Sequence, residues 1–145
     1  MEWLKKWFLK RQLRKAERAS AGKTFPFPVA PRVVGILAGS KESAQACKEL
    51  AKTHIPGAEQ FHVLYWQEET TELEGFNEND FDWMALPEPK IQAFIDAEID
   101  LLIWAEPEPS AFSLLLLYSK RSCFRMGLHQ RDLEPHLDLM CQEGR

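Results

Sequence analysis

The feature that most constrains the fold is an alternation, over residues 32–141, of short apolar runs with segments at helical spacing. The first run, 32–38 (RVVGILA), is almost continuously apolar, which is typical of a parallel strand covered on both faces. Gly39 and Ser40 end this run, and Ser40 can cap the helix that follows. Strands separated by helices of this length favour right-handed crossovers and a mainly parallel sheet.

The same pattern continues along the chain and predicts its architecture. We expect an α/β fold, a three-layer sandwich of the flavodoxin or half-Rossmann kind, with a mainly parallel sheet of four to five strands. The expected strands are 32–38, 61–66, 100–105, 121–128 and 137–141, and the expected helices are 41–54, 89–97 and 110–120. The acidic stretch 67–80 is expected to be a loop, followed by a short extended piece at 81–84.

Charge is divided unevenly along the chain. Residues 1–24 carry eight basic and two acidic side chains, a balance of +6, whereas the other 121 residues have a balance of −10. Pro26, Pro28 and Pro31 keep the intervening backbone extended and stop a helix from continuing. We therefore expect a basic-aromatic helical arm over 1–24 with its helix at 2–20, a proline-rich linker over 25–31 and an α/β domain over 32–145.

Composition and cysteine spacing exclude several classes of protein. No strictly apolar run is longer than 114–118, which is far shorter than the roughly 20 residues that span a membrane, and the first residues lack the pattern of a signal peptide. Cys47, Cys123 and Cys141 share no spacing typical of a metal site. We therefore expect reduced thiols, no bound metal or cofactor, and a cytoplasmic location, with the inner membrane surface as a place of attachment.

A first candidate site follows the first expected strand. A glycine permits a tight turn there, and the N-terminus of the next helix offers free N–H groups and a positive dipole to an anion. Gly39, Ser40 and Lys41 could hold a phosphate or carboxylate, since ligands of open α/β sheets bind at the carboxyl ends of strands. The loop matches neither the G-x-G-x-x-G nor the Walker pattern, and a capped helix after an ordinary turn explains the same residues.

A second candidate site follows the third expected strand, where Glu106 and Glu108 lie between prolines. If that strand adjoins the first, one of these glutamates would face Ser40 across the crevice and could serve acid–base chemistry or hold a metal. A carboxylate there would also repel a phosphate bound at Gly39. Two solvated loop glutamates are the alternative, and the sequence provides no converging set of catalytic residues.

The N-terminal helix combines aromatic first turns with a basic remainder. One face of the helical wheel carries Trp3, Leu4, Trp7 and Phe8, followed by Arg11, Arg14, Lys15 and Arg18. Such a face suits an anionic membrane interface, the phosphates and bases of RNA, or a groove on a partner protein. Alternatively, the aromatic turns pack on the chain's own domain and leave the basic half in water.

Three stretches carry a family resemblance: RVVGILAGS, FNENDFDWMALPEPKIQAFIDAEIDLLIWAEP, and LLLLYSKRSCFRMGLH with the closing HLDLM. Together they resemble a family of small bacterial cytosolic proteins classed as a domain of unknown function. In the family's N-x-x-D-F/L-x-W/F segment, Asp80, Phe81 and Trp83 match well and Asn79 matches less closely. In its S-K-A-x-F-R-V-G strand the matching residues are Ser119, Lys120, Phe124, Arg125 and Gly127, with Arg121 in place of the usual alanine and two residues instead of one before Phe124.

The resemblance implies a Rossmann-like or flavodoxin-like α/β domain after a short basic segment. It supplies no catalytic residue, because the family has no assigned activity. We expect a non-enzymatic interaction protein that presents its basic-aromatic helix to a protein, to RNA or to an anionic membrane surface. The alternative is a small enzyme or ligand-binding domain that takes a phosphorylated metabolite at residues 39–41 with Glu106, and a third is a domain that dimerises through an edge strand or its third helix.

Overall fold

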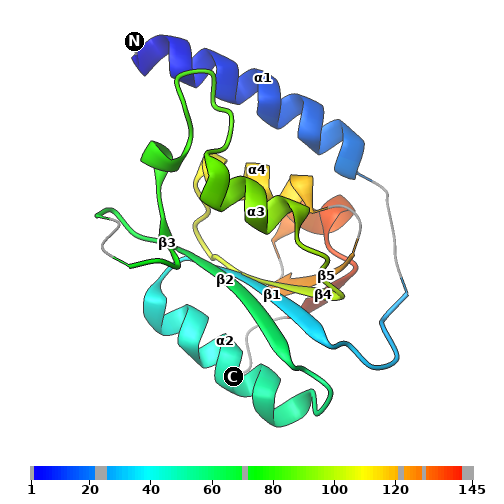
Figure 1. Ribbon diagram of the computed structural model, residues 1–145. Coiled ribbons are helices and arrows are strands. Elements are labelled where there is room, and N and C mark those ends of the chain that lie inside the picture. Colours follow the sequence, from blue (N-terminus) through cyan, green and yellow to red (C-terminus); the bar gives the residue numbers. More distant parts are fainter. Residues whose placement is uncertain (1, 22–25, 70–71, 121–122, 129, 142–145) are drawn as a thin grey trace.

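Within the described residues, six parallel strands form one sheet at the centre of the protein (Figure 1). The strands are β1 (Val33–Ala38), β2 (Gln60–Trp66), β3 (Gly75–Phe76), β4 (Leu101–Ala105), β5 (Phe124–Leu128) and β6 (Leu139–Cys141). Their order across the sheet is β3-β2-β1-β4-β5-β6, and each neighbouring pair runs parallel. The computed structural model describes residues 2–21, 26–69, 72–120, 123–128 and 130–141.

Helices cover both faces of the sheet. Figure 1 shows α2 (Lys41–His54) on one face, and α3 (Pro89–Asp96) and α4 (Ala111–Ser119) on the other. The N-terminal helix α1 (Glu2–Ser20) packs against α4 and forms a further, outermost layer (Figure 1). Two 3₁₀ helices, η1 (Glu78–Asp80) and η2 (Arg131–His136), lie in the connections. The α/β class, the parallel sheet and the N-terminal helix predicted from the sequence are confirmed.

Local signals in the sequence set the helix starts. The Ser40 hydroxyl accepts a hydrogen bond from the Ser43 N–H at 3.1 Å at the start of α2, and Ser110 accepts from the Ser113 N–H at 3.1 Å at the start of α4. Pro89 occupies the first turn of α3, where its missing N–H leaves no hydrogen bond unmade. These caps satisfy backbone N–H groups that have no partner within the helix.

The connections of the chain run from the middle of the sheet toward both of its edges. From β1 it passes through α2 to β2, and from β4 it passes through α4 to β5, on the other side of β1. Right-handed crossovers in opposite directions place α2 and α4 on opposite faces. The carboxyl ends of β1 and β4 therefore meet where the strand order reverses, which is the common ligand position in open α/β sheets.

The sheet has six strands, whereas the sequence predicted four to five. The additional strand is β3, two residues long, within the stretch expected to be a loop: Gly75 pairs with Tyr65, and Phe76 pairs with Trp66. A strand of two residues is too short to show an alternating pattern in the sequence. It is defined by its pairing with the edge of β2. The expected boundary between arm and linker, between residues 24 and 25, lies outside the described residues, as does the start of the strand expected at 121–128.

Candidate functional site

The inner face of α1 packs on the protein's own α/β fold. Leu9 is buried, and Phe8, Leu13 and Ala16 pack against the same apolar core. Leu9, Leu13 and Ala16 recur every three to four residues, so they lie on one side of the helix, with Phe8 beside Leu9. The sequence left open whether this helix packs on its own domain, and the structure answers that it does, through α4.

Polar contacts fix both ends of α1. The Lys5 ammonium donates to the main-chain oxygens of Glu78 at 2.7 Å and Phe81 at 2.8 Å, in the segment that precedes α3. At the other end, the buried Ser20 hydroxyl accepts a hydrogen bond from Nη1 of Arg125 at 2.6 Å and lies 2.9 Å from Nδ1 of His136. The helix is therefore held in one orientation, which decides which side chains face outward.

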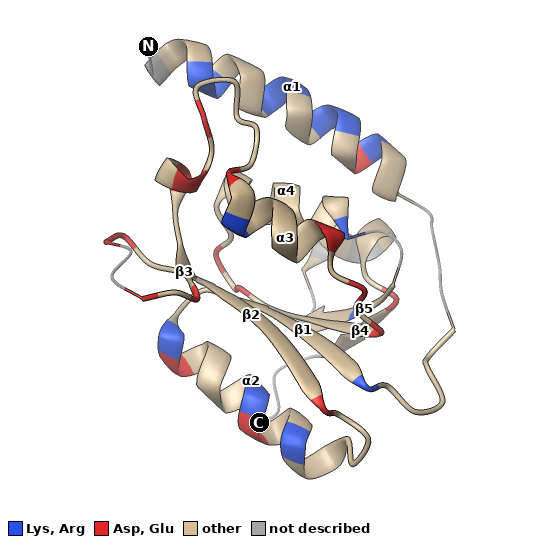
Figure 2. Ribbon diagram, in the orientation of Figure 1, with Lys and Arg blue, Asp and Glu red and all other residues tan. Residues whose placement is uncertain are grey.

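The outward face of α1 is cationic and aromatic. Figure 2 shows that basic residues follow one another along this helix. Trp3 is 73% exposed and Trp7 is 51% exposed. The exposed cations of the helix are Lys6, Lys10, Arg11, Arg14, Lys15 and Arg18, and Glu17 is exposed among them. An open depression of about 840 Å³ lies on this face and is lined by Trp7, Lys10, Arg11, Arg14, Lys15, Arg18 and Ala19.

The cations of this outward face are not neutralised by the rest of the described structure. Within the described residues, ion pairs within 4.0 Å form at Arg32, Lys41 and Lys90, and none forms on α1. The Arg11 guanidinium lies 5.7 Å from the centroid of the Trp7 ring, which is a cation–π contact. The face therefore offers positive charge and an aromatic surface side by side.

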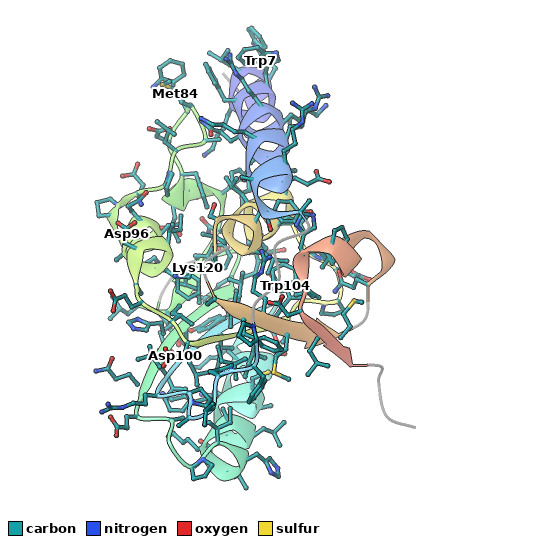
Figure 3. All side chains as sticks on the ribbon, turned by 90° about the vertical axis from the view of Figure 1, so that its right-hand side faces the viewer. Trp7, Met84, Asp96, Asp100, Trp104 and Lys120 are labelled. Carbon is teal, nitrogen blue, oxygen red and sulfur yellow. The ribbon has the colours of Figure 1, made fainter. Side chains whose placement is uncertain are left out.

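A third exposed indole lies next to α1, on the loop that follows η1. Trp83 is 51% exposed, and its ring centroid lies 5.6 Å from that of Phe8, which lies 4.9 Å from that of Trp7. Figure 3 shows Trp7 and Met84 at the same end of the molecule. We call Trp3, Trp7 and Trp83 the tryptophan end. Sequence reasoning did not associate Trp83 with the helix, because the two are far apart in the chain and no local pattern joins them.

The loop that carries Trp83 is held by its own hydrogen bonds. Asn77 and Asp80 cap each other at η1, where the Asp80 carboxylate accepts from the Asn77 N–H at 3.0 Å. The Asp82 carboxylate accepts from the N–H groups of Met84 at 2.9 Å and Leu86 at 3.0 Å. Asn77 and Asp80 thus stand at the N-x-x-D spacing, whereas Asn79 directly precedes Asp80.

The structure brings together part of the anion site expected after β1. The Gly39 N–H donates to the carbonyl of Ala105 at 3.1 Å, and a Cβ at Gly39 would lie 3.6 Å from Cγ of Glu106. Gly39 and Glu106 are therefore neighbours where the strand order reverses. Ser40 caps α2, and the Lys41 ammonium pairs with a Glu72 carboxylate oxygen at 2.6 Å. The hydroxyl and ammonium expected to meet an anion thus already have partners within the protein.

Glu106 is the least ordinary group of this crevice. It is 2% exposed; one carboxyl oxygen accepts from the Ser113 hydroxyl at 3.0 Å, and the other has no hydrogen-bond partner within the described structure. Burial raises the pKa of Glu106 to about 7, against the opposing effect of the Ser113 hydrogen bond. Glu108 is exposed on the same loop. Glu106 can thus hold a proton near neutral pH, next to a glycine that lets the backbone approach closely.

A loop glutamate occupies the space beside α2. Glu72 accepts hydrogen bonds from Lys41 and from the Tyr65 hydroxyl, the latter at 2.5 Å, and burial together with Glu72 raises the pKa of Tyr65 to about 12. An open depression of about 590 Å³ lies here, with Lys48 and Lys52 also on its wall. Within the acidic stretch 67–80, Glu72 thus contacts α2, whereas Glu68, Glu69, Glu74 and Glu78 are exposed.

The thiols and carboxylates form no metal centre in the part of the chain that the structure describes. Cys47 and Cys123 are free thiols, and burial raises the pKa of both. The side chain of Cys141 lies outside the described residues. Across the described helices, no segment is both long enough and apolar enough to cross a membrane.

A comparison with known families matches residues 2–144 to a family of unknown function, DUF6913. The chain belongs to this family. The unknown-function family expected from the three stretches is thus confirmed, and the DUF6913 match includes α1 as well as the α/β sheet. No curated protein and no solved structure matches this DUF6913 chain.

Proposed function

We propose that the protein is a non-enzymatic interaction protein that binds an anionic surface of a protein, an RNA or a membrane through the outward face of α1. One observation carries the proposal: five cations line the open depression on that face, beside the half-exposed Trp7. A cation without a partner carboxylate remains free to pair with an external anion.

The length and charge of α1 favour a large partner over a small one. The helix has 19 residues and is therefore about 28 Å long, with its cations spread along it. Charges within about 10 Å of one another act together at moderate ionic strength. A partner with many negative charges can engage the whole row, whereas a single small anion would engage one or two side chains. The remaining 121 residues, with a balance of −10, would be repelled by the same partner, so α1 would face it.

Retention on a heparin column tests this proposal with a polyanion that has neither bases nor acyl chains. The test variant is Arg11→Gln with Arg14→Gln, and the matched control is Lys48→Gln with Lys52→Gln on α2. Both remove two charges, so both chains have the same net charge. We expect the α1 variant to elute at clearly lower salt, because it loses two contacts, and the control to elute with the wild type. Equal elution of the two variants would contradict the proposal.

The proposal includes a cytoplasmic location, supported by the unpaired thiols of Cys47 and Cys123. The compartment can be checked by fractionating cells that produce the full chain. Recovery from an oxidising, extracytoplasmic fraction would contradict this part of the proposal.

A small-ligand function is the second candidate, and the buried carboxyl of Glu106 beside Gly39 favours it. Against it stand the partners that Ser40 and Lys41 already have. Thermal-shift measurements against nucleotides and sugar phosphates test it, because a ligand at about 100 times its dissociation constant adds about 2.7 kcal/mol of stability. A shift that Glu106→Ala abolishes would support this candidate, and the absence of any shift would remove it.

A further inference from the structure

We propose that the anionic partner is a membrane surface, which the protein approaches with the tryptophan end and the cations of α1 together. This inference rests on the function proposed above and names its partner. It begins from the position of Trp83, which joins the exposed indoles of α1 only in the folded protein.

The three indoles form one group at one end of the molecule. Trp3 and Trp7 lie one turn apart on α1, and Trp83 reaches the same end through its contact with Phe8. Each of the three is at least half exposed. Exposure of this much aromatic surface is unfavourable in water, whereas indole rings are stabilised at the level of the lipid headgroups.

Most of the exposed cations of α1 follow its indoles along the helix. Arg11 contacts the Trp7 ring, and the basic row continues from there toward the C-terminal end of α1. In an anionic bilayer, phosphates lie at the same depth as interfacial indoles, so a surface that carries both groups side by side fits it. Each Lys or Arg near such a surface strengthens binding by about fivefold at moderate ionic strength.

The arrangement of the rings favours a membrane over a nucleic acid. Proteins that bind single strands place open ring faces along a cationic groove, so that successive bases stack between phosphate contacts. Here the indoles gather at one end, and Trp7 is already contacted by the Phe8 ring and the Arg11 guanidinium. Five of the six exposed cations of α1 thus follow the indoles along the helix, and Lys6 lies between Trp3 and Trp7.

Co-sedimentation of the full chain with vesicles tests the inference. The probes are vesicles of phosphatidylcholine alone and vesicles of phosphatidylcholine mixed with phosphatidylglycerol. We expect binding to the mixed vesicles, a shift of tryptophan emission to shorter wavelength, and little binding to phosphatidylcholine alone. Emission that does not shift on binding would overturn the inference, because the rings would still be in water.

Removal of indoles distinguishes insertion of the rings into the bilayer from attraction between the cations and the anionic lipids. The test variants are Trp3→Ala and Trp3→Ala with Trp83→Ala, and the control is Leu50→Ala with Leu73→Ala, which also removes exposed apolar side chains. We expect the double tryptophan variant to bind mixed vesicles at least about tenfold more weakly. Trp3→Ala alone keeps the contact between Trp83 and Phe8. Weaker binding by this variant would therefore come from the lost indole and not from loosening of α1. Heparin retention should be unchanged in all of these variants.

The outcomes distinguish the inference from the function on which it rests. Vesicle binding that depends on Trp3 and Trp83 supports both. Two outcomes overturn the membrane inference and leave the proposed function standing. The first is retention on heparin or on RNA without vesicle binding, and the second is vesicle binding that is as strong in the tryptophan variants as in the wild type. Failure to bind heparin, RNA and vesicles alike overturns both.

Discussion

At the scale of single residues, two buried cations of the fold donate to neutral oxygens. The Lys120 ammonium, 2% exposed, donates to the carbonyls of Ile95 at 3.0 Å and Ala97 at 2.6 Å, at the end of α3. The fully buried Arg125 donates to Ser20 and to the carbonyl of Leu117. Burial lowers the pKa of both cations. These contacts tie helices to each other and to the sheet, so we assign both residues a structural role.

Loss of the Lys120 ammonium should destabilise the protein. In Lys120→Met, two carbonyls at the C-terminal end of α3 lose their donor and the favourable interaction of a cation with the helix dipole. We expect the free energy of unfolding in urea to fall by about 2 kcal/mol. Lys52→Met, on the exposed face of α2, is the control and should change it little. Equal effects of the two changes would contradict the structural role of Lys120.

Glu106 should make stability depend on pH. Burial raises its pKa from 4.5 to about 7, so the folded state holds the proton more tightly than the unfolded state. Its contribution to stability is therefore fully present below pH 4.5 and is lost as the pH rises through about 7. We expect Glu106→Gln to raise the free energy of unfolding at about pH 8 by up to about 3 kcal/mol, with little effect at about pH 4.5. Urea unfolding at both pH values measures this.

Glu108→Gln is the control for that measurement, because Glu108 lies exposed on the same loop. It should leave the pH dependence of unfolding as in the wild type. If the wild type and Glu106→Gln show the same pH dependence, the carboxyl of Glu106 ionises in the folded protein without penalty.

At the scale of elements, α1 is a packed layer with two chemically different faces. Its inner face carries Leu9 and Leu13 onto the core, while Trp3 and Trp7 face outward. The helical wheel placed Phe8 with the two tryptophans, but the structure turns Phe8 inward enough to pack on the core and on Trp83. A helix docked in this way presents its cations in a fixed row.

Truncation of the inner face should loosen α1. Leu9→Ala removes a buried side chain, and we expect the free energy of unfolding to fall by about 2–4 kcal/mol. Leu50→Ala, at a leucine that is 59% exposed on α2, should change it by less than about 0.5 kcal/mol. Urea unfolding followed by circular dichroism compares them. Equal stability of Leu9→Ala and wild type would mean that docking of α1 contributes nothing to the fold.

At the scale of the whole molecule, α1 and the sheet should unfold together. The helix shares the larger core with α3, α4 and one face of the sheet, and its end residue Ser20 bonds to Arg125 of β5. Small single domains usually unfold in a single transition. The sequence-based division into an arm over 1–24 and a domain over 32–145 stays a prediction about organisation, and cooperativity tests it.

Two probes can measure that cooperativity. Urea unfolding followed by far-ultraviolet circular dichroism reports all helices, and tryptophan emission reports α1, its neighbouring loop and the sheet, through Trp7, Trp83 and Trp104. We expect the two curves to have the same midpoint. An earlier transition in one probe, removed in a chain that lacks residues 1–24, would show instead that α1 unfolds on its own.

The sequence by itself determined what depends on neighbours in the chain. Ser40 and Ser110 cap the helices that follow them, because the side-chain oxygen of each accepts from a backbone N–H three residues later. The apolar runs of β1 and β4 identify central strands, because both faces of these strands must be covered. The uneven charge of residues 1–24 and the rest is likewise a property of the sequence.

Only the tertiary structure decided which distant segments meet. The two-residue β3, the adjacency of Gly39 and Glu106, and the contact of Trp83 with Phe8 all depend on strand order and on the docking of α1. Local periodicity identifies a buried face but does not identify the surface that buries it. That choice follows from packing between segments far apart in the chain, where the burial of apolar area outweighs the entropy of ordering them.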